Sequence, residues 1–104
     1  MSLPLTRKSV DRSDKERFIF SFYCDCCGNE WTSLPMFFMT GGFSTIEHEE
    51  ARQLVWTYEH KTAFEHANLD ARIKFNLCLK CGRWVCNECY NTENNVCKVC
   101  LRKL

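Results

Sequence analysis

The sequence predicts a small α+β domain, and three observations lead to this fold class. Two aromatic and β-branched segments flank the first cysteines, one long segment has helical periodicity, and the cysteines occur in closely spaced pairs. A chain of 104 residues suits one domain that buries roughly 65% of its unfolded surface. Nine residues are cysteine, which a chain of this size rarely carries without a covalent or metal constraint.

The N-terminal part of the chain predicts a tail followed by a hairpin. Residues 1–17 are polar and charged, and this composition predicts a mostly disordered tail. Residues 18–43 predict a hairpin with the first cysteines at its tip, because segments 18–23 and 30–34 are rich in aromatic and β-branched residues. The apolar stretch 35–43 is either core beneath a helix or a partner-binding surface.

Residues 44–75 predict one long helix, inserted between the first and second cysteine pairs. Residues 44–47 read Ser-Thr-Ile-Glu, which fits a capping box. Apolar side chains follow at helical spacing, namely Ala51, Leu54, Val55 and Tyr58, extended by Phe64, Ala67 and Ala71. Such a helix reaches roughly 35 Å, which is long for so small a domain, so we consider a homodimer through this helix.

Eight of the nine cysteines form four C-x-x-C pairs. Two thiolates separated by two residues can both bind one zinc ion, and two such pairs close a structural site. The metal-ligating candidates are Cys24, Cys27, Cys78, Cys81, Cys86, Cys89, Cys97 and Cys100. They predict two zinc ions per chain, each contributing about 10–16 kcal/mol to folding, so the metal-free chain should be largely unfolded. A redox dithiol and an iron–sulfur cluster are the alternative uses of these thiolates.

The four C-x-x-C pairs can be combined into two metal sites in three ways. A glycine, Gly28 or Gly82, follows the second cysteine of the first two pairs, as a zinc knuckle requires where its turn needs a positive φ. The pairs that begin at Cys86 and Cys97 have no such glycine and suit the first turn of a short helix. One knuckle and one helix start per site give an interleaved cross-brace or a nested arrangement. Two knuckles on one ion give a sequential zinc ribbon.

From Cys78 the chain reads C-x-x-C-G-x-x-x-C-x-x-C, followed from Val96 by V-C-x-x-C. This segment, residues 78–100, resembles the second half of a FYVE-type zinc finger, which is a treble-clef cross-brace. The resemblance implies eight zinc ligands in interleaved pairs and a C-terminal helix that begins at the last pair. The W-x-x-D, basic and R-V-C elements through which that family binds phosphatidylinositol 3-phosphate are missing, so lipid binding is not implied.

Charge and hydropathy exclude several classes of protein. The net charge is +1, with 14 basic and 13 acidic residues, which excludes a highly basic DNA-coating protein. The chain has no apolar run of the roughly 18 residues that span a membrane, and its first residues lack the apolar core of a secretory signal. We therefore expect a cytoplasmic protein, or a nuclear one in a eukaryotic cell, with no membrane contact.

The expected function is a non-catalytic zinc-binding module that presents a surface to a protein partner. A closed four-thiolate site leaves no position for a catalytic water, so we expect no enzyme and no catalytic or cofactor-binding residue beyond the metal ligands. The alternative is a nucleic-acid-binding zinc finger or ribbon, such as a transcriptional regulator, with Arg83, Trp84 and Trp31 as contact residues. Thiol redox sensing and ubiquitin ligation through a RING-like cross-brace are further alternatives.

Four residues with metal-binding side chains fall outside the pairs. Cys26 is expected to be a spectator beside the first pair. His48, His60 and His66 are not three or four residues apart, so they cannot bind one metal from a single helical face. We expect these histidines at surface or partly buried positions.

Overall fold

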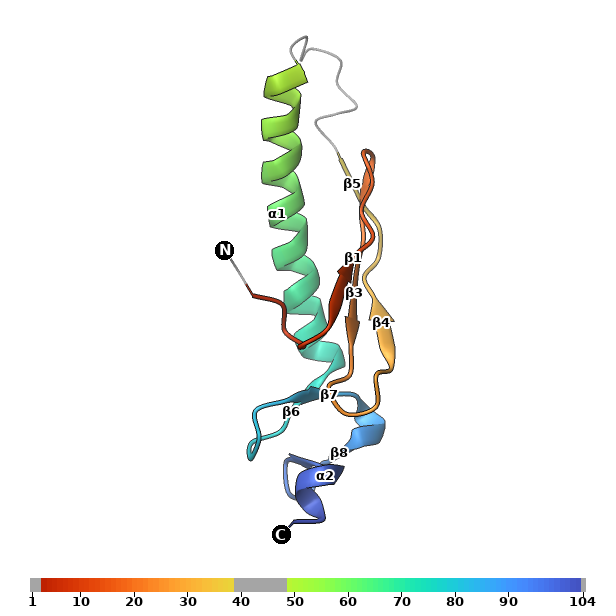
Figure 1. Cartoon of the computed structure of the whole chain (residues 1–104), viewed down its shortest axis with the longest axis vertical. Coiled ribbons are helices and arrows are strands. Elements are labelled where there is room, and N and C mark those ends of the chain that lie inside the picture. The colour runs from red at the N-terminus through yellow and green to blue at the C-terminus, as the bar shows by residue number, and fades with distance from the viewer. Residues whose placement is uncertain (1–2, 39–48, 104) are drawn as a thin grey trace.

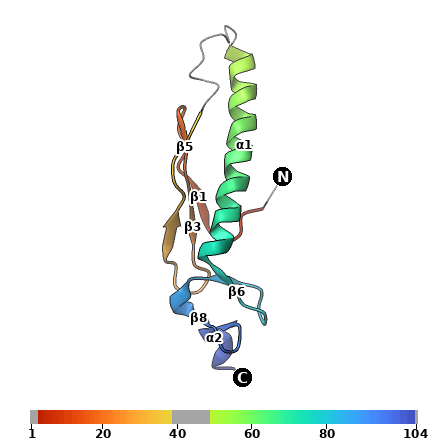
Figure 2. The ribbon, with the colours of Figure 1, turned by 180° about the vertical axis from the view of Figure 1, so that it is seen from behind.

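The structure is a computed structural model that describes residues 3–38 and 49–103 of the chain. The molecule is long and narrow, with principal extents of 61 × 21 × 17 Å. One long helix lies beside a small sheet, and the cysteine-rich C-terminal part extends below both (Figure 1). The opposite view shows the same order along the long axis (Figure 2).

The helices and strands of the described ranges are short except for one. In chain order they are β1 (Ser9–Asp11), β2 (Arg17–Phe18), β3 (Phe20–Tyr23), β4 (Glu30–Thr32), β5 (Met36–Phe37), α1 (Glu49–Lys74), β6 (Asn76–Leu77), β7 (Trp84–Val85), the 3-10 helix η2 (Asn87–Cys89), β8 (Tyr90–Asn91), β9 (Val96–Cys97) and α2 (Lys98–Leu101). The strands form a three-stranded antiparallel sheet in the order β1-β3-β4 and three two-stranded pairs, β2-β5, β6-β7 and β8-β9.

The central strand β3 alternates apolar and polar side chains. Phe20 and Phe22 are buried beneath α1, whereas Ser21 faces the other way and its hydroxyl lies 2.9 Å from the hydroxyl of Thr32 on β4. Such alternation is what a strand covered by a helix on one face requires. The β3–β4 hairpin, with the first cysteine pair at its tip, agrees with the hairpin that the sequence predicts.

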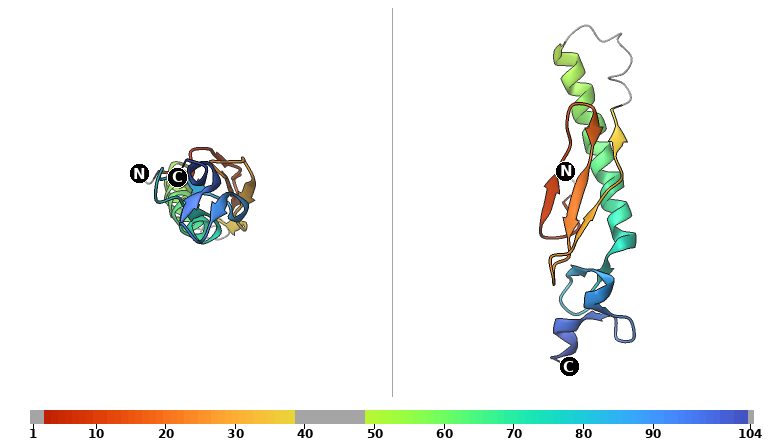
Figure 3. Two further views of the ribbon diagram at one scale, coloured as in Figure 1. Left: turned by 90° about the horizontal axis from the view of Figure 1, so that it is seen from below. Right: turned by 90° about the vertical axis from the view of Figure 1, so that its right-hand side faces the viewer.

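The helix α1 contacts the sheet through small and aromatic side chains. Ala63, Ala67 and Ala71 are 5%, 0% and 0% exposed, and their small size lets the helix approach the strands closely. The ring of Phe64 lies 5.2 Å from that of Phe20 and 6.2 Å from that of Phe22. The side view shows the strands in front of the helix and running roughly along it (Figure 3). Aromatic burial here supplies much of the apolar core.

The face of α1 that packs differs from the predicted face in the first half of the helix. Phe64, Ala67 and Ala71 are on the packed face, but Leu54 and Tyr58 are 74% and 71% exposed. The sequence contains two apolar lines at helical spacing, and the prediction joined them into one. The second line packs against the sheet, whereas in the first line Leu54 and Tyr58 are exposed and Val55 is partly buried against the core.

Residues 3–17 are folded, although the sequence predicts a disordered tail there. β1 pairs with β3 over three residues, Leu5 N donates to Asn68 Oδ1 of α1 at 2.7 Å, and Thr6 is buried. Composition is a poor guide here because backbone pairing with a sheet does not require apolar side chains.

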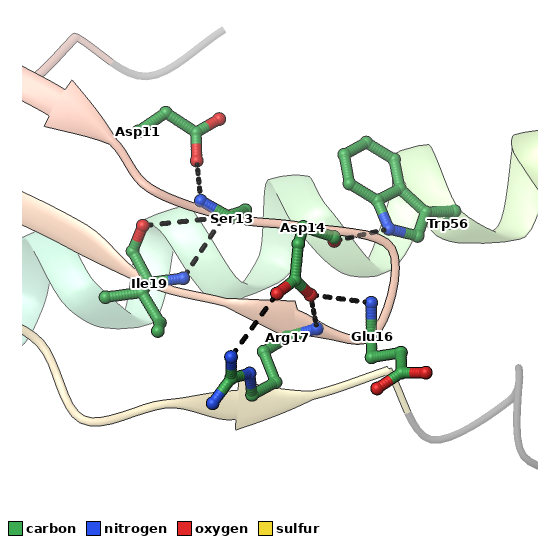
Figure 4. Close-up of polar contacts among 7 residues, drawn as sticks. All are labelled: Asp11, Ser13, Asp14, Glu16, Arg17, Ile19 and Trp56. Atoms are coloured by element: carbon green, nitrogen blue, oxygen red, sulfur yellow. Dashed lines mark hydrogen bonds and ion pairs between the residues drawn. The ribbon is translucent and has the colours of Figure 1, made fainter.

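Polar side chains shape the turn that connects β1 with β2 (Figure 4). The Asp14 carboxylate accepts the backbone N–H of Glu16 and of Arg17, each at 2.8 Å. The Trp56 indole N–H donates to the Asp14 carbonyl at 3.3 Å, which attaches the turn to α1. Aspartate favours such turns because its carboxylate binds nearby backbone N–H groups, so the same residues that suggest disorder by composition build a defined turn.

Some predicted features lie outside the described residues. The capping box at 44–47, His48 and the end of the apolar stretch at 39–43 belong to this group. The described part of α1 begins at Glu49 and ends at Lys74, within the predicted range of 44–75. Its 26 residues span about 39 Å.

We expect Phe22→Ala to lower the free energy of unfolding by about 3–5 kcal/mol, because Phe22 is 0% exposed and its ring packs between Trp31 and Phe64. Denaturant unfolding at a fixed zinc concentration measures the change. Phe37→Ala is the matched control, since Phe37 is 62% exposed and its loss should cost less than about 1 kcal/mol. Equal losses in the two variants would contradict the described core.

Candidate metal centres

Eight cysteines form two groups in the part of the molecule below the sheet and α1. In each group the four Sγ atoms all lie within 4.8 Å of one another. No cysteine forms a disulfide. The first group is Cys24, Cys27, Cys86 and Cys89, and the second is Cys78, Cys81, Cys97 and Cys100. Each group could hold one metal ion.

The two groups are interleaved along the chain. The first C-x-x-C pair shares a group with the third, and the second shares a group with the fourth. This is the cross-brace among the three arrangements that the sequence leaves open. Cys24 lies with Cys86, and not with Cys78 as in a sequential ribbon or with Cys97 as in the nested arrangement.

The first and second pairs lie on two knuckles of the same geometry. Gly28 and Gly82, which follow these pairs, have φ values of 80° and 75°. Gly28 N donates to Cys24 O at 3.0 Å, and Gly82 N donates to Cys78 O at 2.9 Å. A residue with a Cβ rarely adopts such φ values, which explains the glycine at this position of each knuckle.

The third and fourth pairs lie at helix starts, as the sequence predicts. Cys86 is the N-cap of η2 and Cys89 is its last residue. Cys97 is the N-cap of α2 and Cys100 lies within it. In each pair, one helical turn brings the second thiol back toward the first.

Backbone N–H groups stabilise the thiolate of Cys24 in the first group. Burial raises the pKa of Cys24, but the N–H groups of Cys27, Cys86 and Cys26 donate to its sulfur at 3.4, 3.2 and 3.3 Å and lower the pKa to about 6. A lowered pKa favours the deprotonated form that binds metal.

In both groups one thiol has a lowered pKa and another has a raised pKa. Burial raises the pKa of Cys78, but backbone N–H groups, among them that of Cys81 at 3.5 Å, lower it to about 6. Burial and the neighbouring thiols raise the pKa of Cys100 to about 12, and they raise that of Cys89 in the first group well above its ordinary value. Four thiolates therefore repel one another, and a bound cation is what allows all of them to ionise.

The distances between sulfur atoms are of the size that a single metal ion with four ligands requires. Cys27 Sγ lies 3.6 Å from Cys86 Sγ, and Cys81 Sγ lies 3.9 Å from Cys97 Sγ. A tetrahedral zinc ion with Zn–S bonds of about 2.3 Å separates its sulfur ligands by about 3.8 Å. Both groups thus match the donor set and the size of a four-thiolate site for one ion.

Asp25 connects the first knuckle to two other segments, a role that the sequence reasoning missed. Its carboxylate accepts the backbone N–H of Arg7 at 2.8 Å and of Trp84 at 3.0 Å, and its own N–H donates to Trp84 O at 3.0 Å. These bonds hold β7, which leads directly into Cys86, against the first knuckle. The position of this aspartate between Cys24 and Cys27 is the sequence feature that could have indicated this role.

Cys26 and the described histidines stand apart from both groups. Cys26 is half-buried beside the first group, and its sulfur is not one of the four ligand atoms. His60 Nε2 lies 2.7 Å from Asp11 Oδ2, and the imidazole stacks on Trp56 at 4.8 Å. His66 is exposed on α1. His60 therefore connects β1 with α1.

No protein-family model, no curated protein and no solved structure matches this chain. In the described part of the chain no helix is both long enough and apolar enough to cross a membrane.

We expect Cys27→Ser to remove one of two bound metal ions, because it takes a ligand from the first group, and Cys26→Ser to remove none. Cobalt titration followed by thiolate-to-metal absorption, together with metal analysis, measures the stoichiometry. A Cys26→Ser chain that holds a single ion would show that Cys26 is a ligand and would contradict this assignment.

We expect Asp25→Ala to weaken metal binding at the first group by about 10- to 100-fold, the usual effect of removing a group that positions metal ligands. Competition with a chromophoric chelator measures the affinity of each ion. Asp70→Ala, which removes an exposed carboxylate from α1, is the control and should leave both affinities unchanged. Equal behaviour of the two variants would exclude the positioning role of Asp25.

Proposed function

We propose that this protein is a non-catalytic zinc-binding module whose two four-cysteine sites are structural and whose folded surface binds another protein. The observation that carries the proposal is the pair of interleaved four-cysteine groups, with all sulfur atoms of a group within 4.8 Å. Four thiolate ligands favour zinc over calcium and magnesium, which prefer oxygen ligands. An iron–sulfur cluster, with several irons between its thiolates, would hold the sulfur atoms further apart than one ion does.

The position of the sites supports a structural role. The first site would join the β3–β4 hairpin to η2, since Cys27 and Cys86 are separated by 59 positions in the sequence. The second site would join the β6–β7 knuckle to α2. Strands β6 to β9 have two residues each, so the C-terminal part has little regular structure to stabilise it without metal. Metal binding there supplies folding free energy.

The ligand set supports a non-catalytic role. Four thiolates fill the coordination sphere of a tetrahedral ion, so substrate or water has no position to occupy. In the second group three of the four cysteines are buried, and only Cys81 is exposed. A catalytic zinc site usually keeps one position open.

Exposed apolar side chains support an interaction with protein. Single exposed apolar residues are normal on any surface, but an elongated molecule with several of them on one helix offers a contact area. Those exposed among the described residues include Leu3, Leu34, Phe37, Leu54, Tyr58, Leu69, Ile73 and Leu79.

The nucleic-acid alternative has weaker support. The Arg72 guanidinium lies over the Trp84 ring at 5.9 Å, and the Trp31 ring stacks on Phe22 at 5.9 Å. Both indoles thus make contacts within the fold instead of forming an open platform on which bases could stack. Strongly salt-dependent binding of random single-stranded DNA or RNA would favour this alternative over a protein partner.

We expect chelation of the metal to unfold the C-terminal part and zinc to restore it, because structural sites couple metal binding to folding. Near-ultraviolet circular dichroism and amide exchange of residues 76–103 measure this. In the cobalt-substituted protein, added azide should leave the absorption spectrum unchanged, since a closed site has no position for it. A metal-free chain with the native spectrum, or an azide-sensitive cobalt spectrum, would contradict the structural role.

A further inference from the structure

The face of α1 opposite the sheet has four exposed apolar side chains. Leu54 and Tyr58 are 74% and 71% exposed, and Leu69 and Ile73 are 59% and 81% exposed. Each pair is spaced i, i+4, and at about 100° per residue all four lie within roughly a third of the helix circumference. The buried alanines of α1 lie on the other side, against the sheet.

Two opposite charges occupy the same face between the apolar pairs. Lys61 and Glu65 are both exposed and fall on the line that connects Tyr58 with Leu69. We call the six residues Leu54, Tyr58, Lys61, Glu65, Leu69 and Ile73 the α1 seam. The order of residue types is the same from both ends of the seam: two apolar residues, two charged residues and two apolar residues. The order of the two charges differs, because the lysine comes first from one end and the glutamate comes first from the other.

We propose that the α1 seam binds the α1 seam of a second copy of this chain in antiparallel orientation. A two-fold axis near the midpoint of the seam places Leu54 against Ile73 of the second copy and Tyr58 against Leu69 of the second copy. A two-fold interface requires a surface that is complementary to itself, and the symmetric spacing of the seam meets this requirement.

Charge determines the orientation of the two copies. The antiparallel arrangement places Lys61 opposite Glu65 of the second copy, and the two-fold axis generates the same pair again. A parallel arrangement would place Lys61 opposite Lys61 and Glu65 opposite Glu65, where like charges repel. Charge complementarity thus favours a second copy of this chain bound in the antiparallel orientation.

The fold leaves the α1 seam accessible. The strands lie along the other side of the helix (Figures 1 and 2). The N-terminal segment approaches α1 at Asn68, whose side-chain amide donates to Leu3 O at 3.1 Å, yet the adjacent Leu69 stays 59% exposed. The seam extends over about 28 Å of the roughly 39 Å of α1, so two copies would meet along most of the helix.

This inference rests on the proposed protein-interaction function and identifies a second copy of the chain as the protein that binds the α1 seam. Sedimentation equilibrium of the zinc-loaded full chain at several concentrations, with metal analysis of the same samples, tests for the dimer. We expect a mass that rises toward twice 12.3 kDa with concentration. Ile73→Glu should raise the dimer dissociation constant at least about tenfold, whereas Leu34→Glu, at a residue 84% exposed outside α1, should leave it unchanged.

Charge exchange tests the antiparallel orientation. Lys61→Glu and Glu65→Lys should each weaken the dimer by about fivefold, and the double variant should restore the original affinity because both pairs form again. A dimer that Ile73→Glu leaves intact, or a double variant no stronger than the single ones, would overturn the inference. A monomer at all concentrations that still holds two metal ions overturns this inference alone, whereas a monomer without metal overturns the proposed function as well.

Discussion

The requirement that four cysteine pairs meet in interleaved order governs the path of the whole chain. The first pair lies at the lower tip of the β3–β4 hairpin, and its companions Cys86 and Cys89 come about 60 residues later. The chain leaves the tip along β4 and returns along α1, which brings β6 to the same end of the molecule (Figure 1). Cys78 directly follows β6 in the sequence. A helix of 26 residues is therefore the return path that brings the last three cysteine pairs to the first.

The aromatic part and the cysteine part share one core. Buried residues continue from Phe22 through Ala71 and Phe75 to Cys78 and Val85 without a break between the two parts. Asp25 adds polar bonds across the same junction. Because cysteine side chains and aromatic rings pack in one cluster, loss of order in the cysteine part would remove packing contacts from the aromatic part. The two parts are thus coupled in stability, although their stabilising interactions differ.

The sequence predicted those features that local chemistry determines. The glycine after the second cysteine, which needs a positive φ, predicted both knuckles. The pairs without such a glycine were predicted to lie at helix starts, where the structure has them. It left the pairing of the knuckles open, because long-range order is not encoded in C-x-x-C spacing. It also assigned Leu54 and Tyr58 to the core, since periodicity shows that a line of apolar residues exists but not which line the sheet covers. The turn at Asp14 was missed because its polar residues act through backbone contacts.

The central claim is that two zinc ions are bound by interleaved cysteine pairs, and anomalous diffraction at the zinc edge tests it most directly. The account predicts two peaks per chain, each surrounded by four sulfur atoms at about 2.3 Å, with Cys24 and Cys86 at one peak and Cys78 and Cys97 at the other. A single peak, or one ion shared by Cys24 and Cys78, would contradict it.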